Sequence, residues 1–180
     1  MKRLFLLVSV FGICCFSQST YGQSVQASKA SIAAYSQEWK GERSADGRPR
    51  VSDDLVRRAR NISLEEAWGV LRNEGYTNQF VGDWKIMRPE QPMAGRALTV
   101  TYMPARPDME NPIKEQGTKE KRSGASNSWP IDMLQEGDIY IADGFGKIQD
   151  GTLIGDNLGN SIYAKSKNGV IFDGSVRDLE

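Results

Sequence analysis

Hydrophobic and polar residues follow a helical period in the first half of the chain. Ser52 offers an N-cap for a helix over residues 53–60. Ser63 and Glu66 form a capping box for a second helix, which ends at Gly75. Both segments have one apolar face, so the pattern predicts surface helices with a structural role.

In the second half of the chain the pattern becomes one of short strands. Residues 96–103 alternate apolar and polar side chains and predict a strand. Residues 138–142 and 170–172 predict two further strands, with a helix over 157–167 between them. Strand, helix and strand in this order form a parallel unit, which makes the chain an α/β protein. The polar stretch 108–130 is expected to be a long surface loop.

The N-terminus has the organisation of a secretory signal peptide over residues 1–22. A basic start precedes thirteen apolar residues over 4–16, and we expect cleavage before Gln23. A membrane-spanning helix needs roughly 20 apolar residues, so no permanent membrane anchor is expected. The sequence thus predicts an exported protein, periplasmic or secreted, with a polar arm over 23–51 and an α/β domain over 52–180.

Composition excludes several function classes. The chain has 23 basic and 23 acidic residues, no His and two Cys. A net charge of zero gives no electrostatic reason to expect a nucleic-acid partner. The absence of His excludes Ser-His-Asp and Cys-His catalysis and mixed Cys/His zinc sites. Both cysteines, Cys14 and Cys15, lie in the predicted signal peptide, so any metal would be held by oxygen ligands.

Candidate chemistry lies in the last 30 residues. The helix after the second predicted strand begins at a polar turn of four residues, Gly155, Asp156, Asn157 and Leu158. Backbone N–H groups at a helix start have no helical partner, and together with the helix dipole they attract anions. The loop after the last strand carries Arg177, whose planar guanidinium can bind a carboxylate and an adjacent keto oxygen. Loops that leave the same edge of a parallel sheet face one another, which predicts a site for a small carboxylate.

Two carboxylates flank this predicted site. Asp156 and Asp178 offer hard oxygen ligands, which suit Mg²⁺ or Mn²⁺ held largely through water. The same residues are also common in ordinary turns, so a purely structural role is the alternative. Dinucleotide-binding, P-loop and EF-hand sites are excluded, because their glycine, Gly-Lys-Ser/Thr and acidic frames are absent from the sequence.

Three segments, 138–146, 155–158 and 169–178, together resemble the RraA-like family. This family contains regulators of ribonuclease E activity and class II aldolases that act on 4-hydroxy-4-methyl-2-oxoglutarate. An Asp, twenty intervening residues and an Arg-Asp pair form the signature of the aldolases, and Asp156 and 177–178 match it.

The resemblance implies a role for each matching residue. The backbone of residues 155–158 and the Arg177 side chain would bind the pyruvyl part of the substrate. Asp178 would hold Mg²⁺ through water, and Asp156 would position a water near the reacting carbon. The activity implied is metal-dependent cleavage of 2-oxo acids of the 4-hydroxy-4-methyl-2-oxoglutarate type to pyruvate. Oxaloacetate decarboxylation is implied as well, because both reactions pass through the pyruvate enolate.

The resemblance also implies a three-layer β/β/α swivelling domain that assembles into homotrimers or hexamers. Family members usually continue past the motif and receive an acidic group from a neighbouring subunit. A chain that ends at Glu180 is therefore expected to be an incomplete domain. A non-catalytic regulatory or binding protein on the same scaffold is the alternative function, because regulators of the family act through protein surfaces and need no metal.

Overall fold

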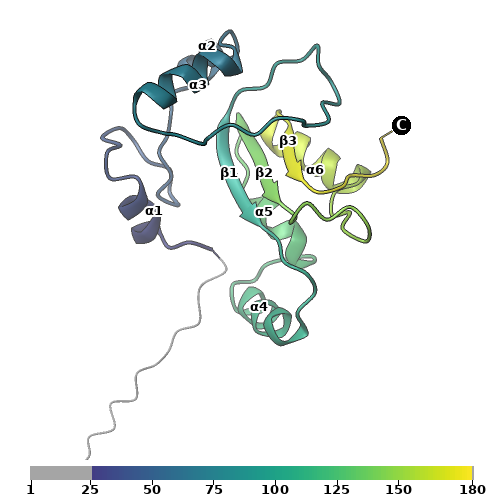
Figure 1. Cartoon of the computed structure of the whole chain (residues 1–180). Helices are drawn as coiled ribbons and strands as arrows, with labels where there is room; N and C mark the ends of the chain where they lie inside the picture. Colours follow the sequence, from purple (N-terminus) through teal and green to yellow (C-terminus); the bar gives the residue numbers. More distant parts are fainter. Residues whose placement is uncertain (1–25, 180) are drawn as a thin grey trace, which may run out of the picture.

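The computed structural model describes residues 26–179, so the predicted signal peptide lies outside the described part of the chain. Its centre is a sheet of β1 (Arg96–Thr101), β2 (Asp138–Asp143) and β3 (Val170–Asp173), in that order across the sheet (Figure 1). Both neighbouring strand pairs are parallel. The α/β class and the parallel arrangement of the last two strands are therefore confirmed.

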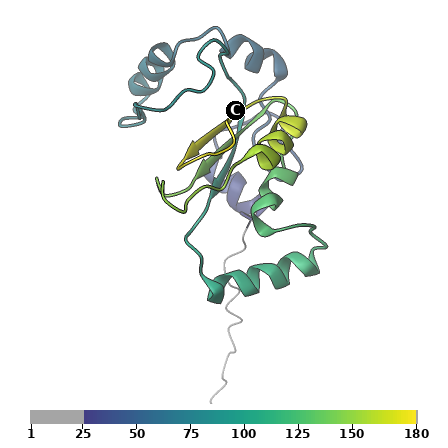
Figure 2. The same cartoon turned by 90° about the vertical axis from the view of Figure 1, so that its right-hand side faces the viewer.

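One face of the sheet carries the hydrophobic core. Two helices, α5 (Trp129–Asp132) and α6 (Asp156–Ser166), lie on the same side of the strands (Figure 2). The buried core residues come from strands, helices and loops alike: Leu98, Ile131, Leu134, Tyr140, Ala142, Ile154 and Ile162. Because α6 connects two parallel strands, it runs back from their carboxyl ends, so its first turn lies at that edge of the sheet.

Three short helices precede the sheet, namely α1 (Lys29–Tyr35), α2 (Asp53–Ala59) and α3 (Leu64–Asn73). The side chains of Ser52 and Ser63 accept hydrogen bonds from the first turns of α2 and α3, the latter within a capping box. Both helix starts are as predicted, since capping is a local signal that depends on a few adjacent residues.

The described part of the polar arm is folded rather than irregular. After α1, residues Arg43 and Pro49 pair in a short antiparallel bridge. The Arg43 guanidinium donates hydrogen bonds to the carbonyl oxygens of Ser36, at 2.6 Å, and Gly47, at 2.9 Å. These bonds give the arm local structure before it meets the sheet.

The prediction of a long loop over 108–130 is wrong. This segment contains most of α4 (Pro107–Lys119), the short 3₁₀ helix η1 (Ser126–Ser128) and the start of α5. Apart from prolines, α4 has only two large apolar residues, Met109 and Ile113, which is why its helical period was not apparent. Its helix is favoured instead by a proline at its start, by acidic residues in its first turn, and by an ion pair of 2.6 Å between Glu110 and Lys114.

Apolar side chains are exposed between α3 and β1, where the chain has no helix or strand. Seven large hydrophobic residues of this segment are at least partly open to solvent: Tyr76, Phe80, Val81, Trp84, Ile86, Met87 and Met93. Several large apolar side chains exposed within one segment are typical of a surface that contacts another chain.

Candidate functional site at the carboxyl edge of the sheet

The two loops that were expected to face one another are in contact. Ile154, just before α6, and Val176, after β3, pair in a parallel bridge. The backbone N–H of Arg177 donates a hydrogen bond of 3.1 Å to the carbonyl of Ile154. This pairing fixes the first turn of α6 against the Arg177 loop, because it is made by backbone atoms of both segments.

Gly155 allows the two loops to approach this closely. A Cβ atom at this position would lie 2.5 Å from Oδ2 of Asp178 and 3.0 Å from Nε of Arg177. The backbone of Gly155 is extended, with a φ of −129°, so the requirement for glycine comes from space rather than from an unusual conformation. The structure thus brings Gly155, Arg177 and Asp178 together.

The first turn of α6 keeps backbone donors available. The N-cap residue is Gly155, which has no side chain to cap this helix. The N–H of Asp156 donates to Oδ2 of Asp178 at 3.4 Å, and the N–H of Asn157 donates to the Asp156 carboxylate at 2.6 Å. Within residues 26–179, the N–H of Leu158 has no hydrogen-bond partner outside the helix. A helix start with open donors is a suitable place for an oxyanion.

Arg177 presents an open guanidinium beside these donors. Its side chain is 71% exposed, and its Nε lies 3.3 Å from Oδ2 of Asp178. Its two terminal nitrogens have no hydrogen-bond or ion-pair partner in the described part of the protein. The planar pair of terminal donors can therefore bind a ligand carboxylate at two points.

Sequence reasoning missed two hydroxyl groups that hold the loops together. Oγ1 of Thr152 and Oγ of Ser175 lie 2.9 Å apart. Ser175 also donates a hydrogen bond of 3.0 Å to the carbonyl of Ile148. Both residues lie in turn-like sequence with no motif, and only the parallel pairing of the two loops brings them into contact.

Comparison with known families identifies the scaffold. Residues 49–180 match the RraA-like family, described as Aldolase/RraA. The chain belongs to the RraA-like family. Its turn at 155–158 and the Arg177-Asp178 pair both lie within the matched region.

Among solved structures, the RraA-like chain is similar to one entitled "Crystal structure of Streptomyces coelicolor RraAS2, an unusual member of the RNase ES inhibitor RraA protein family". The two are 21% identical, with a TM-score of 0.46 over 72% of this chain and 57% of that chain. The RraA-like chain thus spans little more than half the length of that structure. A search of curated proteins finds no match.

The donor set at the edge fits a hard cation that keeps most of its water. No group of three or more His, Cys, Asp or Glu side chains is placed to hold a metal within residues 26–179. Mg²⁺ typically binds through one or two carboxylates and several waters, so such a group is not required. Asp178 is half exposed, and Oδ1 of its carboxylate makes no hydrogen bond or ion pair within that range. Asp178 therefore offers one open carboxylate oxygen to such a cation.

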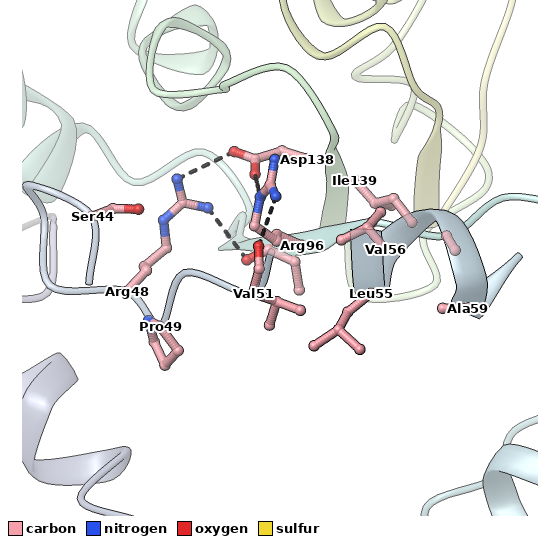
Figure 3. Close-up of a pocket in the computed structure, with 13 residues that line it drawn as sticks. Ser44, Arg48, Pro49, Val51, Leu55, Val56, Ala59, Arg96, Asp138 and Ile139 are labelled. Atoms are coloured by element: carbon pink, nitrogen blue, oxygen red, sulfur yellow. Dashed lines mark hydrogen bonds and ion pairs between the residues drawn. The ribbon is translucent and has the colours of Figure 1, made fainter. Parts of the chain in front are cut away.

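A cavity of the RraA-like chain lies elsewhere, between the arm, α2 and the amino edge of the sheet (Figure 3). It has a volume of about 540 Å³, and its lining includes Val51, Leu55, Val56 and Ile139. Its size alone would favour it as a ligand site. We give more weight to the carboxyl edge, because the charged groups beside this cavity are already paired with one another.

Those charged groups surround the buried carboxylate of Asp138. Its Oδ2 lies 3.2 Å from Nη2 of Arg48 and accepts a hydrogen bond of 3.0 Å from the N–H of Gln135. Its Oδ1 lies 3.5 Å from Nε of Arg96. Figure 3 shows both guanidinium groups pointing toward Asp138. Burial disfavours the charged form of Arg48, but Asp46 and Asp138 outweigh this effect and raise its pKa.

No helix within residues 26–179 is long and apolar enough to cross a membrane.

Proposed function

We propose that the chain is a divalent-metal-dependent class II pyruvate aldolase. Its substrates would be 2-oxo acids of the 4-hydroxy-4-methyl-2-oxoglutarate type, with oxaloacetate decarboxylation as a secondary activity. The observation that carries this proposal is the contact between the α6 turn at Gly155 and the Arg177-Asp178 pair. These residues match the aldolase signature, and in the fold they form one group of donors at one edge of the sheet.

In this mechanism the chain binds the pyruvyl part of the substrate. The N–H groups of the α6 turn and the terminal nitrogens of Arg177 hold the carboxylate and the C2 keto oxygen at two points. Asp178 would hold a hard divalent cation through water, and when bound that cation would polarise the C2 carbonyl. When the C3–C4 bond breaks, its electron pair forms the pyruvate enolate, and the donors aimed at the oxygen stabilise that charge.

Asp156 is proposed to assist proton transfer by holding a water molecule. Its carboxylate lies at the exposed start of α6 and would hold a water near the reacting carbon. In aldol cleavage, the C4 hydroxyl loses its proton as C4 becomes a carbonyl, and C3 of the enolate receives a proton from water. In decarboxylation, CO₂ leaves from the same bond and the same enolate is protonated.

Three broader properties belong to the same proposal. The domain would form the three-layer β/β/α swivelling arrangement, which is supported by the parallel sheet and its helices. It would assemble as a homotrimer or hexamer, which is supported by the exposed apolar residues between α3 and β1. It would be exported to the periplasm or beyond, which is supported by the basic and apolar pattern of residues 1–22.

The test is release of pyruvate from oxaloacetate and from 4-hydroxy-4-methyl-2-oxoglutarate, followed with lactate dehydrogenase, with and without Mg²⁺. Arg177→Ala should lower turnover at least 100-fold, about 3 kcal/mol, which is the loss expected for an oxyanion donor. Arg58→Ala is the matched control, because Arg58 is equally exposed at 71% and lies in α2. Equal turnover in both variants would refute the role of Arg177.

A non-catalytic regulatory or binding protein is the second candidate. It is favoured by the high exposure of Arg177, because a side chain that is 71% open to solvent is available to a protein partner. Regulators need neither a metal nor turnover. If the folded, Mg²⁺-loaded protein releases no pyruvate from either substrate, this second function is the one to pursue.

A further inference from the structure

We propose that the Asp178 carboxylate is an internal anion that occupies the carboxylate subsite until a divalent cation draws it away. The proposal rests on the proposed function for the location of that subsite. It adds a form of self-inhibition, in which one side chain of the site competes with the ligand for the same donors.

The contacts of a single oxygen atom carry this inference. Oδ2 of Asp178 accepts from the N–H of Asp156, at 3.4 Å, and lies 3.3 Å from Nε of Arg177. These donor atoms belong to the two groups, the α6 turn and the Arg177 guanidinium, that a pyruvyl carboxylate would use. The same oxygen is close enough to the α6 turn that a Cβ at Gly155 would lie 2.5 Å from it. The carboxylate therefore fills the space directly against the start of α6.

The geometry also indicates that this carboxylate can leave. Good N–H···O hydrogen bonds have donor–acceptor distances near 2.9–3.0 Å, so both contacts of Oδ2 are long. Asp178 has a left-handed backbone, with a φ of 58°, which is unfavourable for a residue with a side chain. The Asp178 side chain is half exposed, so it can turn toward solvent without disturbing the core.

A cation and a 2-oxo acid should therefore bind cooperatively. A cation that binds Asp178 removes the competing anion and frees the N–H of Asp156 and Nε of Arg177. Linkage makes this effect reciprocal, so the oxo acid also raises the affinity for the cation. We expect the cation to bind before the oxo acid.

Pyruvate binding without metal tests the proposal directly. The affinity of the folded chain for pyruvate is measured by calorimetry or NMR in EDTA, first for wild type and then for Asp178→Gly, which suits a positive φ. The glycine variant should bind pyruvate about fivefold or more tightly than wild type, because the competing carboxylate is gone. Added Mg²⁺ should tighten binding to wild type and change the variant little.

The matched control is Asp150→Gly. Asp150 is also exposed and left-handed, with a φ of 54°, and it lies in the Gly-rich passage before α6. Its replacement removes the same charge and the same backbone strain, but not the contact with Asp156 and Arg177. If Asp178→Gly binds pyruvate no more tightly than wild type or than Asp150→Gly, the proposal is overturned.

Two further readouts separate this proposal from the proposed function. Arg177→Ala should weaken pyruvate binding in EDTA in the Asp178→Gly background; unchanged binding there would place the subsite elsewhere and overturn the inference. If Asp178→Gly shows the expected gain but the Mg²⁺-loaded wild type releases no pyruvate, the internal anion stands and the aldolase function fails.

Discussion

The two edges of the central sheet use the same residue types for different purposes. At the amino edge, Arg48 and Arg96 both pair with Asp138, whose carboxylate is only 1% exposed. At the carboxyl edge, Arg177 and Asp178 share one long contact and are largely open to solvent. Burial and the number of partners thus distinguish a structural ion cluster from a candidate binding site, because only unpaired donors can bind a ligand.

The largest loss of stability is expected from a substitution at the amino edge. Asp138→Asn should lower the free energy of unfolding by about 3 kcal/mol, since it leaves two mostly buried guanidinium groups without their shared counter-charge. Urea denaturation followed by circular dichroism measures this loss. Pyruvate affinity of the folded fraction should remain that of wild type, because the cluster is at the opposite edge.

Asp53→Asn is the control for this variant. Asp53 also pairs with Arg96, at 2.7 Å, but its side chain is 83% exposed. Water screens an ion pair at such a position, so the free energy of unfolding should hardly change. A loss as large as that of Asp138→Asn would contradict the distinction drawn from burial.

At the carboxyl edge we expect a substitution to affect pyruvate affinity and turnover more than the free energy of unfolding. In Gly155→Ala, the new Cβ would lie 2.5 Å from Oδ2 of Asp178 and 3.0 Å from Nε of Arg177, so both side chains must shift and the methyl group fills the space against the α6 turn. We expect pyruvate affinity and turnover to fall about tenfold or more, roughly 1.4 kcal/mol. The free energy of unfolding should fall by only about 0.5–1 kcal/mol, because the extended backbone of Gly155 suits alanine but glycine is the better helix N-cap.

Gly159→Ala gives the matched comparison within the same helix. A Cβ at Gly159 would meet no atom within 4 Å. Alanine should stabilise α6 by about 0.5–1 kcal/mol, because glycine is a poor helix former, and should leave pyruvate affinity unchanged. If Gly155→Ala behaves in the same way, the close contact of the two loops does not matter for binding.

The elements that could be predicted from sequence are those with local signals. The N-cap residues Ser52 and Ser63 predicted the starts of α2 and α3. The strand-helix-strand order predicted that the Gly155 and Arg177 loops would meet at the carboxyl edge of the sheet. Helix α4 was missed because it has only two large apolar residues apart from prolines. Gly117 of α4 packs against the ring of Trp129 in α5, and this contact depends on the tertiary structure.

The remaining features depend on distant partners or on the backbone of single residues. Arg48 and Asp138 are 90 positions apart, so their pairing has no local sequence signal. Arg96 lies directly opposite Asp138 in the parallel pair of β1 and β2, but this register is known only from the folded sheet. Likewise, the left-handed backbone that turns Asp178 toward α6 is not encoded in the aldolase signature.

The smallest predicted effect is the pH dependence of the stability that Asp46 contributes at the amino edge. Burial tends to raise the pKa of Asp46, but hydrogen bonds from the backbone and side chain of Arg48, and its charge, outweigh burial and lower the pKa. A carboxyl group with a lowered pKa in the folded state stabilises the fold above its unfolded pKa of 3.8. That contribution is lost as the pH falls through the folded-state value.

Asp46→Asn should therefore lower the free energy of unfolding at pH 7 by at most about 1 kcal/mol, and the difference from wild type should shrink as the pH falls below 4. Urea denaturation of both proteins at a series of pH values measures this convergence. Asp150→Asn serves as the control, because Asp150 has no ion-pair partner within residues 26–179, and it should give no comparable loss at pH 7. A constant difference between Asp46→Asn and wild type from pH 7 to pH 3 would show that the Asp46–Arg48 pair contributes through packing rather than through charge.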